Sequence, residues 1–235
     1  MRLITFNIAS LDGRIAVSRS TPAWLDPTWK PLEHFEPVDI MALHKTRLSL
    51  QGSNSFTARS AGTADFGDYA GPEVPAGDFL PSSLRSHAGR WLVVIDSRAR
   101  VRWTTFEMRD TRLAVLLAAA TPGPYRAFLR DHDVPYVEAG PQRVDLPAAL
   151  ARLAAVFAAS SIISDAGGVL NGALFRAGLV DEVDVQFLPA IVGQPEAPAI
   201  FEGFDLGTLG IPALLELVSA EARPDGSIFA RYTVP

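Results

Sequence analysis

The stretch from Ser160 to Gly193 constrains the fold more than any other part of this 235-residue chain. The β-branched run Ser161–Ser164 predicts a buried strand, and a tight turn follows at Asp165–Gly168. Leucines and a phenylalanine then recur at helical spacing, which predicts a helix from about Val169 to Gly178. The partly alternating run Val183–Leu188 predicts the next strand. Strand, paired glycines, helix and strand in this order are typical of an α/β protein that binds a phosphate group.

Two interpretations of the glycine pair Gly167-Gly168 are open from these residues. Residues without a Cβ let a ligand approach the backbone, and the N-terminus of the following helix favours an anion. The pair could equally serve a turn that only needs unusual backbone angles. The full dinucleotide motif G-x-G-x-x-G is absent, so the glycines do not decide between these interpretations.

A longer string around the glycines resembles a known family. An acidic residue and the glycine pair are followed by Leu170-Asn-Gly-Ala-Leu174, then Ala177-Gly-Leu-Val-Asp-Glu-Val183, then Pro189-x-x-x-Gly193. This string resembles the C-terminal reductase domain of the deaminase–reductase protein of riboflavin biosynthesis. That family shares the fold of dihydrofolate reductase.

A second resemblance lies at the N-terminus, where a predicted strand, Arg2–Ala9, runs into Ser10-Leu-Asp-Gly-Arg-Ile-Ala16. Asp12-Gly13 is a common turn pair, and a plain hairpin turn is one interpretation. The other is the loop that in the family closes over the nicotinamide and presents an aspartate near the substrate. We favour the second, because the loop occurs together with the glycine turn.

The remaining patterns predict the fold class. Apolar runs at Trp91–Asp96 and Leu113–Ala119 are typical of parallel strands, and Asp145 is placed to cap a helix over Leu146–Ala159. Pro212–Arg223 and Ser227–Val234 predict a terminal antiparallel hairpin. We therefore expect a three-layer α/β/α protein of dihydrofolate-reductase-like fold. It would have a mostly parallel central sheet, the C-terminal hairpin, and a single reductase-like domain over residues 1–235.

The resemblance implies NADPH as the cofactor and also implies its site residues. Asp12 and Asp165 would face the substrate as the catalytic residues, although the family typically has glutamate at the second position. Arg59 stands roughly where the family has an aspartate, which is a second departure. The cofactor contacts would be Ile8, Trp24, Gly52, Ser53, Ser55, Ser97, Gly167, Gly168, Val169, Leu170 and Asn171. Arg98 and Arg100 follow Ser97, and they are either partners of a 2′-phosphate or solvated turn residues.

Composition excludes several classes. A net charge of −5 without a basic block argues against nucleic acid, and no apolar run approaches the length of a membrane helix. The chain lacks cysteine, which excludes disulfides and thiolate metal sites and suits a cytoplasmic protein. The four histidines lack metal-ligand spacing, so we expect surface or loop residues and no metal site. The zinc deaminase signature is also absent, which leaves the reductase half alone.

The leading hypothesis is a stand-alone, NADPH-dependent reductase of a (phospho)ribosylamino-pyrimidine or a related heterocycle. A dihydrofolate- or pterin-type reductase is the first alternative. A non-catalytic module that keeps the fold is the second, and its mark would be a cofactor cleft blocked by the Gly/Pro-rich excursion Ala61–Leu84. Family members often form dimers, and the predicted strand from Val183 to Val192 could pair across subunits of a homodimer.

Overall fold

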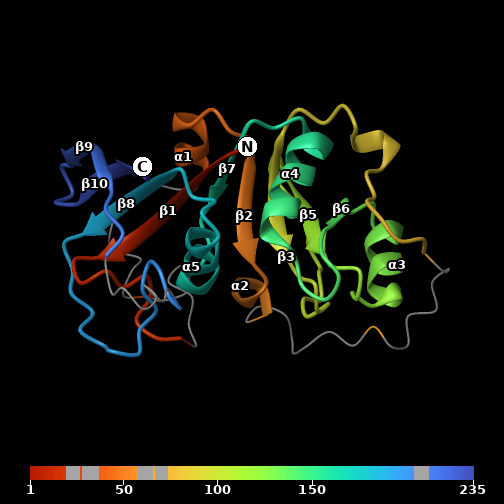
Figure 1. The fold of residues 1–235 in the computed structure, drawn as a ribbon, viewed down its shortest axis with the longest axis horizontal. Coiled ribbons are helices and arrows are strands. Elements are labelled where there is room, and N and C mark those ends of the chain that lie inside the picture. The colour runs from red at the N-terminus through yellow and green to blue at the C-terminus, as the bar shows by residue number, and fades with distance from the viewer. Residues whose placement is uncertain (20–26, 28–36, 58–65, 67–73, 204–211) are drawn as a thin grey trace. The chain divides into compact units, whose positions relative to one another are not determined.

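The computed structural model describes residues 1–19, 27, 37–57, 66, 74–203 and 212–235. They form two compact units. Figure 1 labels the helices and strands of both. The terminal unit consists of Arg2–Thr46 and Ile162–Pro235, and the middle unit consists of Arg47–Ser161 with Met1. That residues 1–235 act as a single reductase-like domain stays a prediction.

The terminal unit is built on a mixed sheet with the strand order β7-β1-β8-β10-β9. The strands β1 and β8 are parallel, whereas β10 is antiparallel to both β8 and β9. The predicted C-terminal hairpin is therefore confirmed, and Gly226 in its turn has a φ of 81°. The strand bounds are Arg2–Ser10 for β1, Ser161–Ser164 for β7, Glu182–Leu188 for β8, Glu216–Ala222 for β9 and Ile228–Thr233 for β10.

Two helices pack with this sheet, α1 (Pro37–Leu43) and α5 (Gly168–Arg176). The apolar residues of α1 join side chains of β1, β7 and β10 in one buried cluster. Helix α5 begins directly after Gly167 and ends before Gly178, whose φ of 64° suits a residue without a Cβ. The cluster contains Ile4, Phe6, Ile40, Met41, Ile163 and Phe229.

The middle unit contains strands in the order β4-β5-β3-β2. The strands β2 and β3, β3 and β5, and β5 and β6 pair in parallel, while the short β4 is antiparallel to β5. The nearly continuous apolar sequences of β3 and β5 are the signal that predicted parallel strands. The bounds are Leu48–Gly52 for β2, Arg90–Ile95 for β3, Glu107–Met108 for β4, Thr111–Leu117 for β5 and Tyr136–Glu138 for β6.

The helices of the middle unit are α2 (Asn54–Thr57), α3 (Gly123–Asp131) and α4 (Leu146–Phe157), with a 3-10 turn at Ser82–Leu84. Asp145 caps α4 as predicted, because its Oδ1 accepts a hydrogen bond of 2.9 Å from the backbone N–H of Ala148. At the other end Phe157 lies against Trp91 of β3, with ring centroids 4.9 Å apart.

The structure also corrects some expected boundaries. Strand β8 ends at Leu188, as the alternating run Val183–Leu188 predicted. It does not continue to Val192, as the dimer expectation assumed, since Pro189 lacks the N–H that a ladder needs. Helix α4 ends at Phe157 rather than Ala159. Half of the excursion Ala61–Leu84 lies outside the described residues, and in the described half Phe79 pairs with Tyr136 through the backbone. No helix formed by the described residues is long and apolar enough to cross a membrane.

Candidate active site

The loop after β1 is fastened to the loop after β8 by the side chain of Asp12. Its two carboxylate oxygens accept hydrogen bonds from the backbone N–H groups of Val192 (3.1 Å) and Gly193 (2.9 Å). The hydroxyl of Ser10 donates a third bond of 2.6 Å. These three donors, the Ser10 hydroxyl first, lower the pKa of Asp12 to about 2. The carboxylate is therefore ionised at neutral pH and serves as an acceptor for both loops.

The same N-terminal loop pairs with the segment Ala197–Glu202. Arg14 and Ala199 form an isolated antiparallel bridge, and Ile15 donates its N–H to the carbonyl of Pro198 at 2.9 Å. Arg14 Nη1 also donates to the carbonyl of Ala197 at 2.8 Å. The segment thus lies beside the Asp12 loop along several residues.

The segment Ala199–Glu202 in turn packs directly on the first turns of α5. The N–H of Glu202 donates to the carbonyl of Gly168 at 2.9 Å. A Cβ at Gly168 would lie 2.1 Å from the carbonyl oxygen of Ala199, and one at Gly172 would lie 1.9 Å from that of Glu202. Both distances are impossible for real atoms, so these two glycines are required by the chain's own packing.

Gly167 differs from Gly168 in this respect. It is exposed, and a Cβ at its position would meet nothing within 4 Å. It is also the N-cap residue of α5, and no side chain caps that helix. An uncapped helix N-terminus presents N–H groups and a partial positive charge, which together suit an anion. Only the first glycine of the pair therefore leaves room for a ligand.

In the middle unit, the loop after β3 is shaped around the buried Asp96. Its carboxylate accepts bonds from the N–H groups of Arg100 and Val101, each at 3.0 Å, and from the Tyr125 hydroxyl at 2.9 Å. Burial, with the Asp96 charge as a second cause, raises the pKa of Tyr125 well above its ordinary value. Tyr125 therefore stays protonated and acts as a donor to Asp96. This network fixes the loop that carries Ser97.

Arg100 in this loop reaches back to the end of β2. Its Nη2 donates to the Ser53 hydroxyl and to Asn54 Oδ1, each at 2.7 Å. Its Nε is buried and has no hydrogen-bond partner among the described residues, and no ion pair within that part of the chain includes Arg100. The guanidinium of Arg100 is therefore held in place by Ser53 and Asn54, and no carboxylate in the described part of the chain forms an ion pair with it.

A family model described as RibD C-terminal domain matches residues 2–229. The chain belongs to the RibD C-terminal domain family. The resemblance read from the glycine turn and the Asp12 loop is thereby confirmed.

Individual relatives agree with this family. The chain is 31% identical over 142 residues to the 2,5-diamino-6-ribosylamino-4(3H)-pyrimidinone 5′-phosphate reductase of Methanothermobacter thermautotrophicus. That match spans 60% of this chain and 65% of the relative.

Solved structures show the same fold at low identity. A pyrimidine reductase-like protein of Corynebacterium diphtheriae has a TM-score of 0.65 and 17% identity, covering 100% of this chain and 92% of that one. A riboflavin biosynthesis reductase of Saccharomyces cerevisiae has a TM-score of 0.60 and 14% identity, covering 100% and 90%. RibD of Acinetobacter baumannii has a TM-score of 0.65 and 21% identity, and this chain spans 58% of its length. The α/β class expected from the sequence is confirmed.

The structure places the predicted RibD-like site residues as follows. In the terminal unit, hydrogen bonds connect the Asp12 loop, the Pro189–Gly193 loop and the glycine turn. Asp165 is half-buried at the end of β7, and Ile8 is half-buried in β1. In the middle unit, Gly52 ends β2, Ser53 is bound by Arg100, Ser55 lies in α2, and the Ser97 carbonyl accepts a bond from Thr121. Trp24 and Arg59 lie outside the described residues. The roles assigned to these residues stay predictions.

Sequence reasoning missed several residues that shape this region. Asn7 and Ser164 are buried polar residues beside the glycine turn, and Glu202 closes over it. A signal existed for Asn7, since it is a lone amide in the apolar run Arg2–Ala9. Nothing local marks Glu202, because its role depends on a contact with α5.

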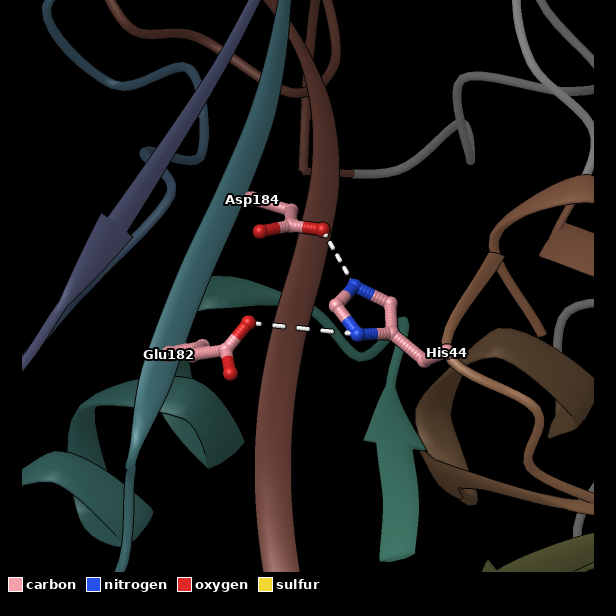
Figure 2. A group of neighbouring side chains, drawn as sticks. All are labelled: His44, Glu182 and Asp184. Carbon is pink, nitrogen blue, oxygen red and sulfur yellow. Dashed lines mark hydrogen bonds and ion pairs between the residues drawn. The ribbon is translucent and has the colours of Figure 1, made fainter. Parts of the chain in front are cut away.

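His44 departs from the expectation for histidines. It lies in a turn after α1, but its side chain is only 2% exposed and its Nε2 is 2.6 Å from Asp184 Oδ2 (Figure 2). Arg2 Nη2 lies 2.8 Å from Nδ1. Because a guanidinium can only donate, Nδ1 accepts a hydrogen bond from Arg2. Nε2 then carries the proton and donates a hydrogen bond to Asp184. Glu182 completes the group, with an oxygen 3.8 Å from Nδ1.

These three side chains are close enough to hold a metal ion, but their charges are already balanced. Arg2 lies 3.4 Å from Glu182, and Arg231 lies 3.3 Å from Glu182 and 3.5 Å from Asp184. A divalent cation would face two guanidinium groups, which oppose it. The cluster also lies at the start of β8, whereas the Pro189–Gly193 loop follows its end. The expectation that the chain has no metal site stays a prediction.

The pKa of Asp12 predicts how the loop clamp responds to acid. A lowered pKa means that the bonds to Val192 and Gly193 are fully formed above the ordinary value of 3.8 and are lost as the pH falls through about 2. We expect the NMR signals of these two amides to remain largely unchanged from pH 6 to pH 3. An Asp12→Asn variant should shift both signals at neutral pH. A midpoint near pH 3.8 in the wild-type protein would contradict the clamp.

The packing at Gly172 predicts a large stability loss for Gly172→Ala. The added Cβ would overlap the carbonyl of Glu202, and overpacking of this kind costs about 2 kcal/mol or more. Gly123→Ala in α3 is the matched control, because nothing lies within 4 Å of its Cβ position. Urea unfolding should show a lower midpoint for the first variant and no loss for the second. Equal midpoints would show that the segment moves aside freely.

Proposed function

We propose that this protein is an NADPH-dependent reductase that acts on a ribosylamino-pyrimidine 5′-phosphate or a closely related heterocycle. The observation that carries the proposal is the set of hydrogen bonds joining the Asp12 loop, the Pro189–Gly193 loop and the segment on α5. The Asp12 loop and the Pro189–Gly193 loop belong to the sequence strings on which the resemblance to the family rests. The reductase from Methanothermobacter thermautotrophicus supports the choice of substrate class.

The residues at the glycine turn fit the diphosphate of a nicotinamide cofactor. Gly167 is exposed with open space on its Cα, and α5 begins there without a capping side chain. The N–H groups of Gly167, Gly168 and Val169 would therefore hold the anion, as helix N-termini commonly do. The Asn171 side chain is fully buried and hydrogen-bonded to Ser164, Asn7 and Ala166, so its contribution is indirect.

Arg100 fits a 2′-phosphate and supports NADPH over NADH. Ser53 and Asn54 orient its guanidinium, and no described carboxylate neutralises it. A guanidinium paired with a phosphate forms strong charge-assisted hydrogen bonds. Arg98 is exposed on the same loop and offers a second positive charge.

NADPH, when bound, supplies the hydride. The chain's own residues orient the substrate and the water that donates the proton. Asp12 is ionised at neutral pH and already accepts three hydrogen bonds, so we assign it to loop positioning and to orienting a water rather than to donating a proton. Asp165 adjoins the glycine turn and is half-buried, so we assign it to the substrate.

The test is NADPH oxidation with ribosylamino-pyrimidine phosphates and, as comparison substrates, pterins. We expect turnover with the former, and Arg100→Gln should raise the KM for NADPH about tenfold or more while leaving the KM for NADH unchanged. Arg102→Gln, at an exposed arginine of the same segment, is the matched control. The proposal fails if the wild-type protein neither binds NADPH nor reduces any of these substrates.

We also propose a homodimer, but at a different strand from the one suggested by the sequence. Strand β8 is hydrogen-bonded to β1 on one side and to β10 on the other, so it has no free edge for a partner. Strand β9 ends the sheet order of the terminal unit, and Leu217 and Val218 on it are exposed. An exposed apolar edge strand favours pairing with a second copy.

This interface predicts a particle of twice the chain mass of 25.3 kDa in light scattering. Val218→Lys places a charge on the β9 edge and should give a monomer, since lysine on an edge strand opposes pairing. Met108→Lys is the control, because Met108 is 69% exposed in the middle unit. A wild-type monomer at high concentration, or a Val218→Lys dimer, would contradict the proposed edge.

A further inference from the structure

A buried polar network lies beneath the glycine turn, although its members come from three different elements. Asn7 of β1, Ser164 of β7 and Asn171 of α5 are 7%, 0% and 0% exposed. The large majority of buried amides and hydroxyls in native proteins are hydrogen-bonded. All three side chains follow this rule: the amides of Asn7 and Asn171 both donate to the carbonyl of Ala166, and the Ser164 hydroxyl donates to Asn171.

The hydrogen bonds fix which way each amide group faces. The Ser164 hydroxyl donates to Asn171 Oδ1 at 2.8 Å, so Asn171 Nδ2 must face the other way, toward Asn7 Oδ1 at 2.7 Å. The reverse orientation of Asn171 would bring its oxygen against the Asn7 oxygen and the Ala166 carbonyl, which repel it. The network is therefore satisfied in a single arrangement.

This arrangement places two donors on one carbonyl oxygen. Asn7 Nδ2 and Asn171 Nδ2 bind the Ala166 oxygen at 3.0 and 3.1 Å. The peptide between Ala166 and Gly167 is trans, and in a trans peptide the C=O and the N–H point in opposite directions. Because the carbonyl is held inward, the N–H of Gly167 points away from the network. Gly167 is the exposed residue of the turn.

We propose that Asn7, acting with Asn171, is a positioning residue that presents the Gly167 amide to the cofactor diphosphate. Neither side chain touches the ligand. They set the peptide plane before the ligand arrives, so that binding requires no reorientation of the backbone. This inference rests on the proposed function, because it assumes that a diphosphate binds at the turn.

A purely structural role is the competing explanation, and the chain offers a matched control for it. Gln186 Nε2 donates to the Ser227 hydroxyl at 2.8 Å, and both residues are at most 1% exposed. This bond is also buried in the terminal unit, but it does not involve Ala166 or Gly167. Ser227→Ala therefore removes a comparable buried hydroxyl without changing the glycine turn.

The experiment measures NADPH binding by fluorescence titration and steady-state kinetics for Asn7→Ala, Ser164→Ala and Ser227→Ala. Asn7→Ala should weaken NADPH binding about tenfold, with kcat at saturating NADPH nearly unchanged, because one hydrogen bond to a charged group is misdirected. Ser164→Ala, which leaves both donors on Ala166, should show a smaller loss and covers the case in which Asn7→Ala does not fold. Ser227→Ala should bind NADPH like the wild-type protein.

A second measurement separates positioning from stability. The Gly167 amide signal in ¹⁵N NMR spectra should shift on adding NADPH to the wild-type protein and should shift much less in Asn7→Ala. Unchanged affinity and an unchanged shift in Asn7→Ala, or an equal loss of affinity in Ser227→Ala, would overturn the proposal while leaving the reductase assignment intact. A wild-type protein that binds no NADPH would overturn both.

Discussion

Close backbone packing between α5 and the segment Ala199–Glu202 is the constraint on which the terminal unit depends. Gly168 and Gly172 have no room for a Cβ, since the carbonyl oxygens of Ala199 and Glu202 occupy that space. The segment held there pairs with Arg14 and Ile15 on its other side. The loop that carries Asp12 is thereby placed in a fixed relation to the start of α5. Asp12 then binds the loop after β8, which closes the arrangement.

Much of this fold follows from local sequence. The apolar runs that become β3 and β5, the cap at Asp145 and the terminal hairpin were each predicted from patterns a few residues long, and each is present. Short-range physics fixes such elements, because burial and capping depend on neighbours in the chain. The end of β8 at Leu188 was also predicted, but the extension to Val192 was wrong. An apolar run continues past Pro189, yet proline lacks the N–H that a sheet ladder needs.

The site was less predictable, for a physical reason. From the sequence, Gly167 and Gly168 read as equivalent, yet one is open and the other is filled by a distant backbone segment. The Asp-Glu pair at 181–182 belongs to the string that identifies the family, but Asp181 accepts a bond from the Leu3 N–H at 2.7 Å and Glu182 joins the His44 cluster. Both support the start of the strands rather than the loops at their ends. Such assignments need the register between strands, which one sequence does not reveal.

Two polar groups in the terminal unit thus have separate tasks. The charged cluster of His44, Asp184 and Glu182 (Figure 2) secures the beginning of β8, together with Arg2 and Arg231. The neutral network of Asn7, Ser164 and Asn171 sets the backbone of the turn where a ligand is expected. The charged cluster therefore supports the fold, whereas the neutral network orients the backbone amide that we propose binds the ligand.

The central claim is that the Gly167 amide, at the uncapped start of α5, receives the diphosphate of NADPH. A crystal structure of the complex with NADPH tests it most directly. The account predicts a diphosphate oxygen about 3 Å from the Gly167 nitrogen, with the Ala166 carbonyl still bound by Asn7 and Asn171. A cofactor bound elsewhere, or a turn whose Gly167 amide faces the protein interior, would contradict it.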